Sequence, residues 1–463
     1  MTIRLYDTNA RQVRDFVPLM PGCVSLYLCG ATVQAAPHIG HIRSGLDFDI
    51  MQRWFRYRGY DVTFVRNVTD IDDKIIRKSA EQGRPWWAIG YENERAFTNG
   101  YDVLGCMPPT YEPRATGHIP EMIEMMRGLI DSGHAYVSDG NVYFDVRSFP
   151  RYLELSNQEL DNLRQPESEG ETGKRDHRDF AMWKAAKPGE PSWETPWGRG
   201  RPGWHLECSA MAHKYLGEVF DIHGGGIDLI FPHHENEIAQ AKAYGDEFAR
   251  YWVHNAWVTM SGEKMSKSLG NSVLVSEMVQ RWRPIVLRYY LGTPHYRSMI
   301  EYSEEALREA EAAFARIEGF VQRVVEKAGP VEPAGEVPPA FAEAMDDDFG
   351  VPQALAVVHT TVRQGNSALT ADDKETAVAR LAEVRAMLGV LGLDPLDPHW
   401  TGADRGEDLH GVVDSLVRLV LEQRQQARSR KDYATADAIR DQLVQSGLEI
   451  EDTPTGSRWT LRG

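Results

Sequence analysis

The spacing of hydrophobic residues in the first 70 positions predicts a strand, a helix and a second strand. Residues 23–29 alternate apolar side chains and residues 61–68 contain short β-branched runs, so both segments are typical of strands. Between them, apolar residues recur at every fourth position, at Ile42, Leu46, Ile50 and Trp54. This spacing is typical of a helix that buries one face. Strands joined by a helix lie parallel, and ligands bind at their carboxyl ends. We therefore expect a Rossmann-like α/β fold with a site after residue 29.

The pattern changes further along the chain. Residues 151–203 are polar and rich in Gly, Pro and Trp, which predicts a long connection or an insertion rather than a regular element. From Ser303, apolar residues step by three and four, which predicts an amphipathic helix with Ser303 as its N-cap, and helices dominate thereafter. Segments 329–339 and 393–406 have the composition of linkers.

These patterns together predict several domains. The expected layout is a parallel-sheet domain over residues 1–295 with a segment inserted at about 110–205, a connecting helix at 296–328, a helical bundle at 340–393 and a small C-terminal module at 407–463.

Charge limits the kinds of partner. The chain of 463 residues has 51 Lys and Arg against 68 Asp and Glu, a net charge of −17, so a nucleic acid would need a local basic patch. Residues 418–431 supply one, with four arginines and Lys431 against Glu422. Four cysteines are too few for a disulfide scaffold. The chain shows neither an export signal nor an apolar run of about 18 residues, so we expect a cytoplasmic monomer without membrane contact.

Two motifs indicate phosphate chemistry. His38-Ile39-Gly40-His41 lies where the first strand turns into the helix, and a helix N-terminus attracts phosphate while Gly40 leaves room for a flat ring. An isolated pair of this kind is more often two ordinary histidines. Residues 261–270 form a Gly- and Ser-rich loop that holds Lys264 and Lys267, and alone it is a solvated basic loop. In this order and on this strand and helix, the two motifs resemble the signatures of class I aminoacyl-tRNA synthetases.

Four further side chains form a candidate metal site. His233 and Glu237 lie four residues apart and share a helical face, and Cys29 and Cys208 add two thiolates. This donor set suits Zn²⁺. The spacing alone is weak evidence, because the ligands come from three distant segments, and without further information both cysteines are better described as small buried hydrophobes.

Longer strings make the resemblance specific. Segments 29–33, 67–74, 203–208, 224–237 and 345–349, with the tail around 431–440, resemble the cysteinyl-tRNA synthetase family over nearly the whole chain. Residues 34–36 depart locally from the family pattern, which leaves their side-chain contacts open. The resemblance implies that one zinc ion is held by Cys29, Cys208, His233 and Glu237. It implies a cysteine pocket made by Cys29, Gly30, Thr69, Trp204 and His223. It implies an ATP site with Mg²⁺ made by His38, Gly40, His41, Asp228 and Lys267, with His38, His41, Lys264 and Lys267 as catalytic residues.

The implied reaction is ATP-dependent activation of L-cysteine to cysteinyl-adenylate, followed by transfer to the 3′ end of tRNA(Cys). A zinc ion that bonds the substrate thiol would reject serine, whereas a hydrophobic pocket separates near-isosteres by only about 1–3 kcal/mol. The alternative is a cysteine:glucosaminyl-inositol ligase of mycothiol synthesis, which uses the same adenylation core. The basic C-terminal module, an anticodon-binding module by resemblance, favours the tRNA ligase.

Overall fold

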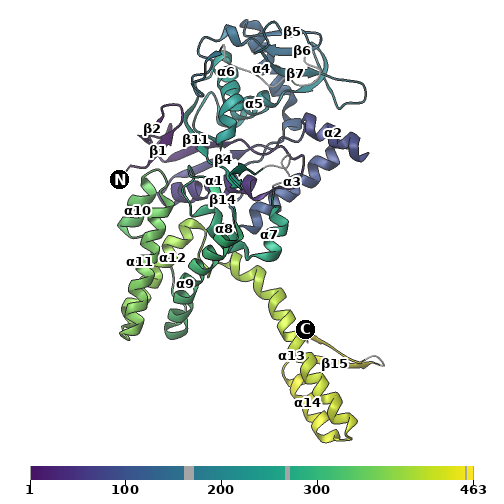
Figure 1. Cartoon of the computed structure of the whole chain (residues 1–463), viewed down its shortest axis with the longest axis vertical. Coiled ribbons are helices and arrows are strands. Elements are labelled where there is room, and N and C mark those ends of the chain that lie inside the picture. The colour runs from purple at the N-terminus through teal and green to yellow at the C-terminus, as the bar shows by residue number, and fades with distance from the viewer. Residues whose placement is uncertain (1, 161–171, 266–271, 454–455, 462–463) are drawn as a thin grey trace. The chain divides into compact units, whose positions relative to one another are not determined.

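A computed structural model describes residues 2–160, 172–265, 272–453 and 456–461 of the chain (Figure 1). Backbone contacts divide the chain into two compact units, Met1–Asp394 and Pro395–Gly463. Lys267 falls outside the described residues.

A four-stranded parallel sheet lies at the centre of the first unit. Its strands follow the order β11-β10-β3-β4, and every neighbouring pair is parallel. The strands are β3 (Cys23–Leu28), β4 (Asp61–Arg66), β10 (Val219–Gly226) and β11 (Phe248–Asn255). Helix α1 (Ile39–Tyr57) connects β3 to β4, so the predicted strand, helix and strand are confirmed. Leu26, Tyr27 and Leu28 are all buried because both faces of the sheet are covered.

Helix α1 is buried on more than its apolar face. Arg43, Asp47, Asp49 and Gln52 are at most 3% exposed, although these residue types normally lie at the surface. The Arg43 guanidinium donates to the carbonyls of Ala256 and Trp257 at 3.0 and 2.8 Å. Because both carbonyls follow β11, this buried cation ties α1 to the carboxyl edge of the sheet.

Segment 151–203 contains regular strands, so the expectation that it lacks them is wrong. An antiparallel sheet of order β5-β6-β7-β9-β8 includes three strands from this segment. All four residues from Phe180 to Trp183 in β7 are buried, and a strand covered on both faces shows no alternation in its sequence. The strands are β5 (Ala135–Ser138), β6 (Asn141–Phe144), β7 (Phe180–Ala185), β8 (Trp193–Thr195) and β9 (Gly198–Pro202).

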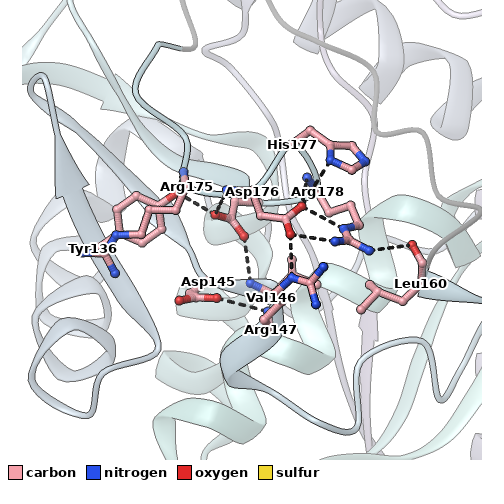
Figure 2. Close-up of polar contacts among 10 residues, drawn as sticks. Tyr136, Asp145, Val146, Arg147, Leu160, Arg175, Asp176, His177 and Arg178 are labelled. Atoms are coloured by element: carbon pink, nitrogen blue, oxygen red, sulfur yellow. Dashed lines mark hydrogen bonds and ion pairs between the residues drawn. The ribbon is translucent and has the colours of Figure 1, made fainter.

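A polar cluster ties the segment before β7 to the short helix η2 (Val146–Ser148). Figure 2 shows the Asp176 carboxylate between two arginines: it accepts from Arg147 Nε at 2.7 Å and from Arg178 Nε at 2.8 Å. Arg178 also donates to the carbonyl of Leu160 at 3.3 Å. Hydrogen bonds from Arg178 hold the pKa of Asp176 well below its usual range despite partial burial, so the cluster stays ionised and fixes this edge of the sheet.

The remaining elements of the first unit are mostly helical. Helix α9 (Glu304–Ala328) begins after Ser303, whose side chain accepts from the Ala306 N–H, so the predicted amphipathic helix and its N-cap are confirmed. The other helices are α2 (Asp73–Gln82), α3 (Trp86–Val103), α4 (Ile119–Asp131), α5 (Trp204–Leu216), α6 (Glu235–Tyr244), α7 (Val275–Arg281), α8 (Pro284–Gly292), α10 (Pro339–Asp346), α11 (Val351–Thr370) and α12 (Lys374–Leu391). The other strands are β1 (Arg4–Asp7), β2 (Gln12–Asp15), β12 (Val258–Met260), β13 (Glu263–Lys264) and β14 (Ile300–Glu301).

The second unit is built from α13 (Pro398–Ser429), α14 (Tyr433–Gln445) and a hairpin of β15 (Leu448–Thr453) and β16 (Gly456–Leu461). Its core holds Val417, Leu443 and Leu448. Residues 402–406, predicted as part of a linker, lie inside α13, so that prediction is wrong. The helix begins earlier because Asp397 caps it by accepting from the His399 N–H.

The basic patch on this unit is smaller than the charge count indicates. Arg424 is buried, and Arg418 pairs with Asp414 at 2.9 Å. The exposed basic side chains of the stretch are Arg418, Arg428, Arg430 and Lys431. Within the described residues, every helix is too short or too polar to cross a lipid bilayer.

Candidate active site

A cavity of about 630 Å³ lies at the carboxyl edge of the central sheet. The last residue of each of the four strands lines it: Leu28, Arg66, Gly226 and Asn255. This is where the strand and helix pattern predicts a ligand site. Gly30 lines it too, and no other residue fits there, because a Cβ would lie 1.7 Å from the carbonyl oxygen of Asn67. The Gly30 N–H donates to Asn67 Oδ1 at 2.8 Å, which joins the ends of β3 and β4.

Four buried side chains meet beside this cavity. Cys29 follows β3, Cys208 lies on α5, His233 lies in the short helix η5 (Ile230–His234) and Glu237 lies on α6. Their ligand atoms all lie within 4.8 Å of one another. Cys29 Sγ is 3.7 Å from Cys208 Sγ and 3.3 Å from Glu237 Oε1, and His233 Nε2 is 2.9 Å from the same oxygen. The fold thus collects these four side chains, which could hold a metal ion.

The electrostatics of the cluster favour a cation. Burial raises the pKa of the Cys29 thiol and of the Glu237 carboxyl well above their usual values, since their surroundings do not compensate a negative charge. Burial also pushes the pKa of Cys208 upward, but the hydrogen bond from Cys29 and the proximity of His233 make the net direction downward. A divalent ion would stabilise the ionised form of all three groups.

Aromatic side chains hold His233 in place. The Trp204 ring stacks on the His233 ring with centroids 4.1 Å apart, and Trp204 also lines the cavity. His205 Nδ1 lies 3.1 Å from His233 Nδ1, so the ring nitrogen that faces away from the cluster has a partner. Metal-binding histidines typically have their second nitrogen held in this way.

The five residues expected to form the cysteine pocket do not all reach the cavity. Cys29, Gly30 and Trp204 line it, whereas Thr69 and His223 are not among the described residues that do. Thr69 is buried and its hydroxyl donates to Glu207 Oε2 at 2.8 Å. His223 is buried as well, with Nε2 3.3 Å from Cys29 Sγ. The structure therefore brings His223 to the cluster of possible metal ligands.

The two histidines of the first motif line the same cavity. The His38 and His41 rings stack with centroids 3.6 Å apart, and the His38 N–H donates to His41 Nδ1 at 3.3 Å at the start of α1. A Cβ at Gly40 would lie 3.1 Å from the His38 ring. The motif thus presents two imidazoles and a bare stretch of backbone at the N-terminus of a helix, where the dipole favours phosphate.

Asp228 and Lys264 form an ion pair that lines the cavity. Lys264 Nζ lies 2.6 Å from Asp228 Oδ2, and Trp257 Nε1 donates to Asp228 Oδ1 at 3.0 Å. Lys264 also lies 5.1 Å from the centre of the Trp257 ring. Lys264 would therefore have to exchange the carboxylate for phosphate oxygens to act on ATP. Lys267 lies outside the described part of the chain.

The sequence analysis missed other residues that line the cavity. Lys74, Arg77 and Lys78 come from one face of α2, and Asn255 and Trp257 follow β11. The spacing of three and four residues between the basic side chains of α2 indicates a shared helical face. The rule that ligands bind after parallel strands also applies to β11. Both signals were available in the sequence.

Comparison with known proteins decides the family. Residues 15–312 match the family described as tRNA synthetases class I (C) catalytic domain, residues 340–395 match the DALR domain and residues 414–459 match the cysteinyl-tRNA ligase anticodon binding domain. The chain is 87% identical to a cysteine–tRNA ligase of Streptomyces avermitilis over 100% of this chain and 99% of that relative. The chain belongs to the cysteine–tRNA ligase family. A family member from Streptomyces griseus subsp. griseus is 86% identical over 100% of this chain and 99% of its own length.

Solved structures of other synthetases share the fold of this cysteine–tRNA ligase family member. Methionyl-tRNA synthetase of Mycobacterium tuberculosis in complex with methionyl-adenylate has a TM-score of 0.59 at 16% identity and covers 84% of this chain and 93% of its own. A putative arginyl-tRNA synthetase from Campylobacter jejuni has a TM-score of 0.52 at 13% identity and covers 80% of this chain and 93% of its own. The expected class I catalytic fold is therefore confirmed.

Proposed function

We propose that the cavity at the carboxyl edge of the sheet is where this cysteine–tRNA ligase family member activates L-cysteine. In the activation step, the carboxylate of cysteine attacks the α-phosphate of ATP, a carboxyl-to-phosphate bond forms, and the bond to pyrophosphate breaks. In the transfer step, a ribose hydroxyl of the terminal tRNA adenosine attacks the carbonyl of the adenylate and AMP leaves. One observation carries the proposal: Cys29 lines the same cavity as His38, Gly40 and His41.

The donor set of the cluster fits zinc. Ligands about 2.0–2.3 Å from a tetrahedral zinc ion lie about 3.3–3.8 Å apart, and the Cys29–Cys208 and Cys29–Glu237 separations of 3.7 and 3.3 Å agree with this range. The shorter His233–Glu237 contact of 2.9 Å is a direct polar contact that a bound ion would replace. We therefore assign Cys29, Cys208, His233 and Glu237 as the residues that would hold one Zn²⁺. When bound, the ion would supply a soft Lewis acid that prefers the thiol of cysteine to the hydroxyl of serine.

The protein's own residues orient both substrates. Trp204 and Gly30 would form the wall and floor of the cysteine pocket, since both line the cavity beside Cys29. We assign Thr69 and His223 as supports of this pocket through the residues they contact. Such positioning brings the carboxylate within reach of the α-phosphate.

The nucleotide would lie against the start of α1. His38 and His41 would contact phosphate, the bare backbone at Gly40 would accept the adenine or ribose ring, and Asp228 would bind the nucleotide opposite them. Lys264 and Lys267 would neutralise charge that develops on the phosphates, together with Mg²⁺ bound to ATP. Direct attack by a carboxylate needs little proton transfer, so these residues act by charge and position.

The C-terminal unit favours tRNA as the second substrate. The relatives reported above are cysteine–tRNA ligases, and the match to an anticodon-binding domain covers residues 414–459. The alternative, a cysteine:glucosaminyl-inositol ligase, has no such support. We further propose that residues 407–463 form the anticodon-binding module, that residues 340–393 form the helical bundle joined by the helix at 296–328, and that the inserted segment at about 110–205 belongs to the catalytic domain 1–295.

We also propose that the protein works in the cytoplasm, because it has four free thiols and uses ATP and tRNA, and that it is a monomer. ATP–pyrophosphate exchange tests the activation step. The expected result is exchange that depends on L-cysteine and falls when His41 is replaced by Asn, while the same substitution at the exposed His177 leaves exchange unchanged. Equal exchange with no amino acid added, or equal rates in the His41 and His177 variants, would contradict the proposed site.

A further inference from the structure

A second set of possible metal ligands overlaps the first. Cys29, His223, His234 and Glu237 are all buried, and their ligand atoms lie within 4.8 Å of one another. Two of these residues, Cys29 and Glu237, also belong to the first set. The second set therefore exchanges Cys208 and His233 for a pair of histidines.

The position of His223 in the second set fits a tetrahedral ion. His223 Nε2 lies 3.3 Å from Cys29 Sγ and 3.4 Å from Glu237 Oε2. Both separations agree with the distance of about 3.3–3.8 Å between ligands of a tetrahedral zinc ion. Glu237 connects the two sets, because Oε1 is the oxygen near His233 and Oε2 is the oxygen near His223.

Two donor atoms of the second set have no hydrogen-bond partner within the described part of the chain. These are His234 Nε2 and Glu237 Oε2, and both side chains are 0% exposed. Buried polar atoms are nearly always paired in native proteins, so two unpaired donor atoms in one cluster indicate a missing ligand.

The other ring nitrogen of His234 is held by a chain of hydrogen bonds. His234 Nδ1 lies 2.8 Å from His254 Nε2, and His254 Nδ1 lies 2.8 Å from the hydroxyl of Thr8. If His234 donates to His254 and His254 donates to Thr8, His234 Nε2 keeps its lone pair for a metal. This arrangement is the support that metal-binding histidines typically have.

We propose that Cys29, His223, His234 and Glu237 form a second position for a divalent transition-metal ion, adjacent to the first. An ion in either position uses Cys29 and Glu237, which leaves the other position only two ligands of its own. The chain therefore binds one ion at a time, in one position or the other. The proposal concerns metal binding alone and does not depend on the reaction.

Cobalt binding tests the proposal, because Co²⁺ takes the same ligands as Zn²⁺ and its thiolate charge-transfer absorbance reports the number of bound sulfurs. In the full chain, Cys208→Ala combined with His233→Ala removes both ligands that only the first position uses. The expected result is one Co²⁺ per chain with about half the charge-transfer absorbance of the unmodified protein. The unmodified protein is expected to bind one Co²⁺ as well, and two ions per chain would overturn the proposal.

A matched variant controls for residual binding by an incomplete first site. Cys208→Ala with His234→Ala removes one ligand from each set, so its affinity for Co²⁺ should be at least about tenfold lower than that of the first double variant. Absence of cobalt from the first double variant, or equal affinity in the two, would overturn the proposal. Circular dichroism in the presence of a chelator establishes that both variants are folded.

A second comparison tests the proposal even if the double alanine variants do not fold. His234→Gln should lower the affinity for Co²⁺ by at least about tenfold in a Cys208→Ser background and by less than about twofold in the otherwise unmodified protein. Equal losses in the two backgrounds would overturn the proposal, since a purely structural role of His234 does not depend on Cys208. Because no reaction is measured, failure here is distinguishable from failure of the proposed function.

Discussion

Asp47→Asn should stabilise the protein, by an amount that increases with pH. Asp47 is 3% exposed on α1, and its nearest cation is the Nε atom of Arg43, 3.5 Å from Oδ2. The other nitrogens of this guanidinium donate to backbone carbonyls, among them those of Ala256 and Trp257. Burial raises the pKa of Asp47 to about 7, and Arg43 offsets only part of that effect. The folded protein therefore holds a proton on Asp47 under conditions in which the unfolded chain releases it.

The magnitude follows from the difference between the two pKa values. An unfolded aspartate has a pKa of about 3.9, and each pKa unit is worth about 1.4 kcal/mol. Since the folded value is raised, the contribution of Asp47 to stability falls as pH rises from about 4 to about 7 and is constant above that. Asparagine removes this dependence. The free energy of unfolding of the variant should match that of the unmodified protein near pH 4 and exceed it by up to about 4 kcal/mol at pH 8.

Asp49, one half-turn further along the same helix, provides a matched control with the opposite sign. Its carboxylate accepts from Arg53 at 2.9 Å, from Arg288 at 2.5 Å and from the Met107 N–H at 2.8 Å. Burial acts to raise the pKa of Asp49, but the two arginines outweigh it and the pKa is lowered. Asp49→Asn should therefore destabilise the protein by about 3–5 kcal/mol at pH 7. This loss should diminish as pH falls below about 4 through the lowered folded pKa.

Urea unfolding monitored by tryptophan fluorescence at pH 3, 4, 5, 6, 7 and 8 measures both effects. If Asp47→Asn destabilised the protein by more than about 1 kcal/mol at pH 8, Asp47 would be ionised and paired with Arg43. That result would refute the reasoning, because in the structure the Arg43 guanidinium donates mainly to backbone carbonyls at the carboxyl edge of the sheet.

Two further predictions concern catalysis and tRNA. Lys267→Ala should lower the rate of ATP–pyrophosphate exchange far more than it weakens cysteine binding, because its charge is needed mainly as the phosphates separate; equal losses in rate and binding, measured by exchange kinetics and calorimetry, would contradict this role. Replacing Arg428, Arg430 and Lys431 together with Ala should raise the KM for tRNA and reduce the salt dependence of charging, while ATP–pyrophosphate exchange stays unchanged. A parallel loss of exchange would show that the variant perturbs more than tRNA contact.

Local patterns in the sequence predicted the elements that determine the position of the site. Apolar residues at every fourth position from Ile42 to Trp54 identified α1. The strand that ends at Leu28 predicted the position of the cavity. By contrast, the strands between residues 180 and 202 were missed. Residues Phe180 to Trp183 are all buried, so no alternation marks β7, and Gly200 lies in β9 where a Cβ would come within 2.3 Å of the neighbouring strand.

The cluster of possible metal ligands shows what sequence spacing leaves open. The interval of four residues indicates that His233 and Glu237 share a face, but it does not indicate where Cys29 and Cys208 lie. Their approach depends on the pairing of β3 with β10 and on the packing of α5, which are contacts between distant segments. Charge counting has a similar limit: the sequence assigns Arg424 to a basic patch, whereas the structure buries it.

The most direct test of the account is the attachment of labelled amino acid to tRNA(Cys) by the purified full-length protein with ATP. Cysteine and serine are compared as substrates, with the protein as isolated, after removal of metal by a chelator, and after zinc is restored. The account predicts that cysteine is attached and serine is not, that removal of metal abolishes the attachment of cysteine, and that zinc restores it. Attachment of serine at a similar rate, or full attachment of cysteine by the metal-free protein, would contradict the account.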